Sequence, residues 1–291
     1  MQESERDNLR RFVIEGAGVR GVLVRLNATW DAVRDCHPYP PAVRDLLGEA
    51  LAAVTLLSAT IKLEGSLILQ AQGEGPLRTL VAQAGSNRTV RGLARWDGEV
   101  PGGELAEAFG AGRLVLTTHN AAGEPYQGIV PLEGAGLAQA LETYFAQSEQ
   151  LPTRLWLAAG AAGAAGLMLQ VLPHAARDPD DWHRVALMAG TVSPRELQDL
   201  PALQLLHRLF SEDDVRVLEA EPVAFRCGCS RARIERTLAA LGAGRVDELA
   251  EDDPEVVVTC EFCNRRYVFD RVDLERALAS APGVESSGTV H

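Results

Sequence analysis

Four of the five cysteines in this 291-residue chain occur as two close pairs near the C-terminus. Cys227 and Cys229 are separated by one residue, Cys260 and Cys263 by two, and 30 residues lie between the pairs. Four cysteine thiolates are a common tetrahedral ligand set for zinc, and ligand pairs on tight turns suit that geometry. The spacing therefore predicts one Zn²⁺ per chain, held by all four cysteines.

The compartment decides between a metal site and two structural disulfides. The chain starts with MQESERDNLRR, which is polar and charged and is not followed by an apolar signal-peptide core. We therefore expect a cytoplasmic protein. In a reducing cytosol clustered cysteines are more often metal ligands or redox centres than disulfides.

A purely structural zinc site is one reading of the four cysteines, and a redox-sensitive site is the other. Thiolates are the form that oxidants attack, and each pair is close enough to form its own disulfide, which would release the metal. Five arginines lie near the pairs in sequence and would favour thiolate: Arg226, Arg231, Arg233, Arg265 and Arg266. Loss of zinc would unfold a small unit that depends on it.

The net charge and the hydrophobic content of the chain restrict the classes of partner that we expect it to bind. The formal net charge is -12, and 46% of the residues are hydrophobic. Such values are ordinary for a soluble globular protein, and an acidic chain repels nucleic-acid phosphates and anionic lipid. We expect neither nucleic acid nor a membrane as partner.

Residues 1–173 show the mixed pattern of an α+β core domain. Apolar residues at helical spacing follow the prolines at 38, 40 and 41, and alternating or apolar runs bounded by glycine indicate strands. The expected helices are 43–61 and 137–147. The expected strands are 22–24, 67–72, 77–84, 89–95, 114–118, 127–132, 154–159 and 166–172.

Residues 174–222 differ in character, with ten acidic residues against five arginines and helical signals interrupted by prolines. Leu200, Leu203, Leu206 and Phe210 form an apolar stripe. We interpret the segment as an acidic helical linker of marginal stability. The alternative is a helical hairpin that belongs to the first domain.

Residues 223–282 form the predicted zinc-binding domain, and residues 283–291 a disordered tail. A strand precedes Cys227, and Ser230 is placed to cap a helix over 231–241. A short helix is expected over 245–251, a hairpin around Cys260 and Cys263, and a closing helix over 273–280.

Other candidate residues receive no functional role. Cys36 is followed by His37, but adjacent residues rarely have nucleophile–base geometry, so a plain free thiol is expected. The single histidines at 174, 183 and 207 show no ligand spacing. The Gly73–Pro76 segment lacks the lysine of a phosphate-binding loop and is interpreted as a turn.

The whole chain resembles the 33 kDa chaperonin family, also called heat-shock protein 33. The most specific segments are FRCGCSRARIERTLAALG and VTCEFCNRRYVFD, which carry the two cysteine pairs in the family's order and at similar separation. The supporting segments are RGVLVRLN, HPYPPAVRDLLGEALAAVTLL, ILQAQGEGPL, GLMLQVLP and LQLLHRLFSEDDVRVLE.

The resemblance implies a redox-regulated holdase chaperone. In the family, cysteines matching Cys227, Cys229, Cys260 and Cys263 hold zinc in the reduced, inactive protein. Oxidation forms Cys227–Cys229 and Cys260–Cys263 disulfides and releases zinc, after which the zinc domain and the linker unfold. The exposed apolar surface then binds unfolding client proteins without ATP, and active family members associate as homodimers.

Two other classes of function are weighed against a holdase. A zinc-ribbon protein that binds nucleic acid would need a basic face, yet the region from Val223 carries nine arginines against twelve acidic residues. A thiol oxidoreductase would use the Cys260–Cys263 motif at the start of a helix, whereas strand signals flank it here. The leading hypothesis is a binding protein with no catalytic residues.

Overall fold

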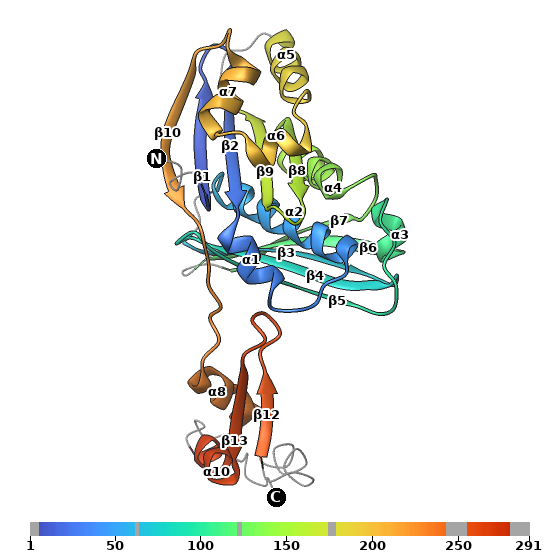
Figure 1. The fold of residues 1–291 in the computed structure, drawn as a ribbon, viewed down its shortest axis with the longest axis vertical. Helices are drawn as coiled ribbons and strands as arrows, with labels where there is room; N and C mark the ends of the chain where they lie inside the picture. The colour runs from blue at the N-terminus through green and yellow to red at the C-terminus, as the bar shows by residue number, and fades with distance from the viewer. Residues whose placement is uncertain (1–5, 62–63, 121–123, 174–178, 243–254, 280–291) are drawn as a thin grey trace, which may run out of the picture. The chain divides into compact units, whose positions relative to one another are not determined.

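The computed structural model describes residues 6–61, 64–120, 124–173, 179–242 and 255–279, and the chain forms two compact units, Met1–Arg226 and Cys227–His291 (Figure 1). Each unit is described separately below. The combination of helices and mainly antiparallel sheets confirms the predicted α+β class. Among the described residues, no helix has both the length and the apolar character needed to cross a bilayer.

A five-stranded sheet forms one layer of the first unit, in the order β10-β1-β2-β9-β8, with antiparallel neighbours throughout. Its strands are β1 (Asn8–Ile14), β2 (Val19–Leu26), β8 (Thr153–Ala159), β9 (Ala164–Val171) and β10 (Val215–Pro222). Every residue of β9 is buried, because helices cover both faces of the sheet.

A six-stranded sheet forms the other layer, in the order β11-β5-β4-β3-β6-β7. Its strands are β3 (Gly65–Gly73), β4 (Leu77–Gly85), β5 (Thr89–Trp96), β6 (Gly112–Asn120), β7 (Tyr126–Pro131) and the two-residue β11 (Ala224–Phe225). The expected hairpin of 77–84 with 89–95 is present as β4 and β5.

The long helix α2 (Pro41–Ser58) lies between the two sheets and fills the main core (Figure 1). Pro40 and Pro41 mark its start. Proline is favourable there because the backbone N–H groups of the first helical turn have no partner within the helix, so the missing N–H costs no hydrogen bond. Gly48 permits close packing against β8: a Cβ there would come within 2.5 Å of the Ala159 methyl carbon. Shorter helices are α1 (Ala28–Arg34), α3 (Leu105–Phe109) and α4 (Leu137–Tyr144), which continues into a π-helical turn η2 (Phe145–Glu149).

The segment predicted as an acidic helical linker is only partly helical. Helices α5 (Pro179–Ala189), α6 (Pro194–Asp199) and α7 (Ala202–Phe210) are followed by strand β10, which pairs with β1. The prediction of a helical segment is therefore wrong for residues 215–222, which form an edge strand. Charged residues are common both on solvated helices and on exposed sheet edges, so the acidic composition did not distinguish the two. The part of the prediction that concerns residues 174–178 lies outside the described residues.

Helix α7 packs on the outer face of the five-stranded sheet through a stripe that differs from the predicted one. Leu206 and Phe210 are buried as expected, but Leu203 is 52% exposed. The buried stripe comprises Ala202, Leu205, Leu206, Leu209 and Phe210. These residues join a second hydrophobic cluster with Phe12, Ile14, Leu23, Leu167 and Leu169 of the sheet.

The second unit contains a hairpin and two helices. Its described elements are α8 (Arg231–Leu241), β12 (Glu255–Thr259), β13 (Arg266–Asp270) and α10 (Arg271–Ala279). The compact-unit boundary at Arg226 lies four residues after the predicted one, because Val223 is buried in the main core and Ala224–Phe225 pair with β5. The helix expected over 245–251 and the tail 283–291 lie outside the described residues.

Candidate metal centre

Two tight segments of the second unit carry the four clustered cysteines. Cys227 and Cys229 lie immediately before α8, whose first turn is capped by Ser230: its hydroxyl oxygen accepts from the Arg233 amide at 3.2 Å. Cys260 and Cys263 lie in the turn between β12 and β13.

Backbone hydrogen bonds fix the second turn. The Cys260 amide donates to the Arg265 carbonyl at 2.9 Å, and the Asn264 amide donates to the Cys260 carbonyl at 2.7 Å. Asn264 adopts a left-handed conformation with φ 55°, which asparagine tolerates better than most residues. The turn thereby holds both sulfur-bearing residues on one side of the hairpin.

The four sulfur atoms form one compact cluster, with every pair within 4.8 Å. The Cys227 and Cys260 sulfurs are 3.6 Å apart, and those of Cys229 and Cys263 are 3.4 Å apart. A tetrahedral zinc ion with zinc–sulfur bonds of about 2.3 Å requires sulfur–sulfur distances of about 3.8 Å. The four cysteines are therefore positioned to bind a metal ion, and an all-sulfur set suits zinc.

The sulfurs differ in their tendency to ionise. Burial raises the pKa of the Cys227 and Cys263 thiols. Burial also opposes ionisation of Cys229, but hydrogen bonds from the Tyr267 hydroxyl and the neighbouring thiols outweigh it and lower its pKa to about 7. Four adjacent thiolates repel one another, so a divalent cation is what would let all four ionise together.

Tyr267 on β13 is a contact of the centre that the sequence pattern did not identify. Its hydroxyl donates to the Cys229 sulfur at 3.2 Å. Hydrogen-bond partners of metal ligands orient them and adjust their basicity. Tyr267 lies four residues after the C-x-x-C motif, at the start of the strand that leaves the cysteine turn.

The arginines expected to favour thiolate have different roles in the structure. Contact with the Tyr267 hydroxyl, and to a smaller extent charge on Cys229, raises the pKa of Arg265. The Arg231 guanidinium instead lies 4.4 Å from the centroid of the Phe269 ring and pairs with Asp273. Arg231 thus stabilises the hydrophobic core of the unit rather than a sulfur.

That core is small. Leu238, Val256, Phe269 and Leu274 are its buried members, with Ile234, Val258, Tyr267 and Leu278 partly buried around them. A unit of this size has little apolar burial to offset the chain entropy of folding, so a metal cross-link would contribute much of its stability.

Cys36, His183 and His207 belong to the first unit, whereas the four clustered cysteines belong to the second. Cys36 follows α1, and its Sγ donates to the Ala32 carbonyl at 3.0 Å. Within the described residues, the four-cysteine group is the one cluster of potential ligands, and it includes neither His183 nor His207. His174 lies outside the described residues.

Comparison with known proteins gives one consistent family. The family model described as "Hsp33 protein" matches residues 7–270. The 33 kDa chaperonin of Nitrosococcus oceani is 56% identical over 99% of this chain and all of its own length. That of Methylobacillus flagellatus is 42% identical over 93% of this chain and 94% of its own.

A solved structure agrees with the sequence comparisons. The crystal structure of the 33 kDa chaperonin from Thermotoga maritima superposes with a TM-score of 0.83 at 26% identity. The match covers 94% of this chain and 98% of that one. It includes both compact units described above.

Proposed function

The chain belongs to the Hsp33 family, and from this premise we propose that it is a redox-regulated, ATP-independent holdase that binds unfolding proteins under oxidative stress. The family itself supports a chaperone function. The observation that supports the finer proposal is the four-sulfur cluster. It lies in a unit with a very small hydrophobic core, and oxidation of its sulfurs would remove the metal cross-link on which that unit would depend.

The proposed reduced state holds one Zn²⁺ through Cys227, Cys229, Cys260 and Cys263. Bound zinc would cross-link the segment before α8 to the turn of the β12–β13 hairpin and keep the four sulfurs as thiolates. Three contacts support the ligand-bearing segments: the Ser230 cap, the Cys260–Arg265 backbone bond and the Tyr267 hydroxyl.

The proposed switch is a two-electron oxidation of each sequence pair. Cys227 and Cys229 form one disulfide, and Cys260 and Cys263 form the other. Each bond removes two electrons from a pair of thiolates, and one peroxide molecule accepts them together with two protons from solvent to give two water molecules. A disulfide sulfur is no longer a thiolate ligand, so each oxidised pair ceases to hold the metal.

The sulfur positions are compatible with this pairing but do not select it. All sulfur pairs lie within 4.8 Å, while a disulfide needs about 2.05 Å, so any pairing requires only local movement. The pairing by sequence neighbours rests on the family resemblance. Mapping disulfide-linked peptides after oxidation decides between the neighbour pairs and the cross pairs Cys227–Cys260 and Cys229–Cys263, whose sulfurs are 3.6 and 3.4 Å apart.

Unfolding of the second unit is proposed to release the adjacent linker, residues 174–222. That segment covers apolar surface: α7 alone buries Leu205, Leu206, Leu209 and Phe210 on the five-stranded sheet. Separation of α7 would expose both faces of this contact. The freed surface is the proposed binding site for client proteins, and the active form is proposed to be a homodimer.

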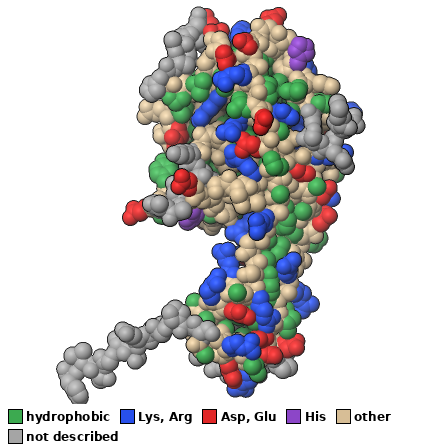
Figure 2. Space-filling view, turned by 90° about the vertical axis from the view of Figure 1, so that its left-hand side faces the viewer, with side chains coloured by type: hydrophobic (Ala, Val, Ile, Leu, Met, Phe, Trp, Pro, Cys, Tyr) green, Lys and Arg blue, Asp and Glu red, His purple; other side chains and the backbone are tan. Residues whose placement is uncertain are grey.

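The proposed location is the cytoplasm. The proposed role is that of a binding protein without enzymatic activity, and neither nucleic acid nor a membrane is a proposed partner. Figure 2 shows both basic and acidic side chains on the surface, and the region from Val223 carries nine arginines against twelve acidic residues, whereas a nucleic-acid-binding domain is strongly basic. The C-x-x-C motif lies in a turn between two strands rather than at the start of a helix, which speaks against a thiol oxidoreductase.

One experiment tests the proposal. The reduced, zinc-loaded chain is treated with hydrogen peroxide at mildly elevated temperature, and zinc release, free thiols and suppression of client aggregation are followed together. We expect zinc release and aggregation suppression to rise together, without ATP and equally in Cys36→Ser. Retention of zinc, or zinc release without suppression, would contradict the proposal.

A further inference from the structure

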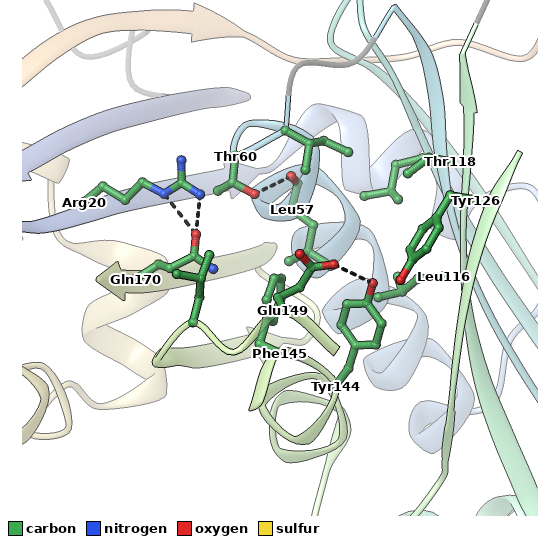
Figure 3. Close-up of a pocket in the computed structure, with 13 residues that line it drawn as sticks. Arg20, Leu57, Thr60, Leu116, Thr118, Tyr126, Tyr144, Phe145, Glu149 and Gln170 are labelled. Atoms are coloured by element: carbon green, nitrogen blue, oxygen red, sulfur yellow. Dashed lines mark hydrogen bonds between the residues drawn. The ribbon is translucent and has the colours of Figure 1, made fainter. Parts of the chain in front are cut away.

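A pocket of about 170 Å³ opens in the first unit, where both sheets meet the ends of α2 and α4 (Figure 3). Its walls are mainly apolar and include Leu57, Leu67, Leu116, Phe145 and Leu151. Ile61 and Tyr126 stand at its rim, with 41% and 54% of their surfaces exposed. The pocket lies within one unit and shares no residue with the cysteine centre.

Arg20 of β2 provides the one cationic side chain of the lining. Its Nε donates to the Gln170 Oε1 atom at 3.0 Å, and one Nη atom donates to the same oxygen. Gln170 is only 1% exposed and is itself fixed, because its Nε2 donates to the Thr153 hydroxyl at 2.8 Å. This chain of hydrogen bonds orients the guanidinium but does not neutralise it.

The charge of Arg20 has no protein counter-ion in the part of the chain that the structure describes. No carboxylate there lies within ion-pair distance of its guanidinium, and the contacts of its side chain are with the neutral Gln170 amide. Partial burial lowers the pKa of Arg20, yet a guanidinium stays protonated at neutral pH. A partly desolvated cation without a partner favours an anionic ligand.

An unusual backbone turn shapes another wall of the pocket. The π-helical turn Phe145–Glu149 extends α4, and Gln150 after it is left-handed with φ 53°. The turn brings Glu149 back to Tyr144, five positions earlier, whose hydroxyl donates to Glu149 Oε1 at 3.2 Å (Figure 3). π-Helical turns are rare and often occur at functional sites, so this geometry is a second observation that points to a ligand.

We propose that this pocket binds a small organic monocarboxylate whose body is a single ring or a branched apolar group. The carboxylate accepts from the Arg20 guanidinium, and the apolar body fills the space between Leu67, Leu116 and Phe145. A cavity of roughly 150 Å³ accommodates benzene, so the volume fits one ring. Glu149 disfavours a second anionic group on the ligand.

The proposal does not depend on the redox function and is tested on the reduced, zinc-loaded full chain. Phenylacetate is titrated by calorimetry into the wild type, Arg20→Met and Arg113→Met. Arg113 is the matched control, since its exposed guanidinium also contacts a glutamine, Gln72, at 3.4 Å, but outside the pocket. We expect Arg113→Met to bind like the wild type and Arg20→Met to bind at least about tenfold more weakly.

A ligand series tests the chemistry of the site. Benzyl alcohol keeps the ring without the charge, and 4-carboxyphenylacetate adds a second carboxylate opposite the first. Both should bind more weakly than phenylacetate. Equal affinity for the dicarboxylate would contradict the role given to Glu149 and with it the monocarboxylate proposal.

A second variant keeps the test decisive if Arg20→Met does not fold. Thr118 lines the pocket from β6, and its side chain makes no hydrogen bond within the described part of the chain, so Thr118→Phe fills space without removing one. Circular dichroism checks that the variant is folded. Failure of the wild type to bind phenylacetate at about 10 mM, or unchanged binding by a folded Thr118→Phe or Arg20→Met variant, overturns the proposal.

Discussion

The aromatic ring of Phe12 on β1 lies against that of Phe210 on α7, with ring centroids 6.1 Å apart and planes inclined by 36°. Each residue is 1% exposed. The contact joins the first strand of the chain to the last helix before β10. The presence of this contact therefore shows that α7 of the proposed linker is packed on the core, and its loss would show that α7 has separated.

Phe210→Ala is expected to loosen α7 and to give partial chaperone activity without oxidation. Removing a buried aromatic ring costs about 3 kcal/mol, because the transferred surface is lost and a cavity is left. Hydrogen exchange should increase across 202–210, and the reduced protein should suppress client aggregation better than the wild type. Leu203→Ala is the matched control, since Leu203 lies on the same helix but is 52% exposed. If hydrogen exchange in the reduced Phe210→Ala protein is faster but suppression of client aggregation is unchanged, release of α7 does not create the client-binding surface.

Metal removal should unfold the second unit while the first keeps its structure. The second unit buries few apolar side chains, whereas the first has two large clusters. A chelator, or Cys229→Ser, should abolish the amide protection of β12 and β13 and lower the bound zinc well below one per chain. Cys36→Ser should leave both measurements unchanged. Retained protection in the zinc-free protein would show that the hairpin is stable without a metal.

Glu49 on α2 should make the protein less stable as the pH rises. Burial, with a smaller contribution from the charge of Asp45, raises the pKa of Glu49 to about 7. Between its unfolded value of 4.5 and about 7, the folded state binds more protons than the unfolded state, so stability falls as pH rises through that window. Glu49→Gln should stabilise the protein by about 1–2 kcal/mol at pH 8 and change little at pH 4.5. Denaturant unfolding at both pH values measures this, and the exposed Glu107→Gln serves as control. Equal effects at the two pH values would contradict this origin.

The ion pair between Arg208 and Glu196 should hold α6 against α7, and protonation of Glu196 at low pH should break this link. The Arg208 Nη2 donates to Glu196 Oε2 at 2.8 Å and to the Thr191 carbonyl at 3.0 Å. Hydrogen bonds from Arg208, and then from Ser193, lower the pKa of Glu196 to about 2. Its contribution is therefore fully present above pH 4.5 and lost as the pH falls toward 2.

Arg208→Gln should reduce the protection of α6 and α7 at neutral pH and make it insensitive to acid in that window. Hydrogen exchange at pH 7 and pH 3 measures both effects. Arg195→Gln is the control, because Arg195 is 91% exposed and pairs with Asp199 of its own helix. A similar loss of protection in both variants would indicate a general effect of charge.

Much of the second unit could be predicted from the sequence because its signals are local. Cysteine spacing, the Ser230 cap and the two strands around the C-x-x-C motif each depend on only a few neighbouring residues. The same holds for β4 and β5, whose turn residues lie between two alternating runs. The role of Tyr267 could not be derived, since its hydrogen bond to Cys229 joins residues 38 positions apart.

The elements that sequence reasoning missed are those determined by distant partners. Strand β1 contains two adjacent arginines and gives a weak strand signal, yet it lies between β2 and β10 in the sheet. Strand β10 resembles a solvated acidic helix because it lies at an edge. The pocket around Arg20 combines side chains from five strands, from the end of α2 and from a π-helical turn that has no sequence signature.

The pairing of β1 with β10 also sets an order for biosynthesis. Glu15 and Arg216, which form an ion pair at the end of this ladder, are 201 positions apart. At about 5–20 residues per second, a ribosome needs roughly 10–40 s to bring β10 out after β1. During that time one edge of β1 has no strand to pair with, and unpaired edges invite association with other chains. A protein of a chaperone family therefore passes through an early period in which its own first strand is in need of protection.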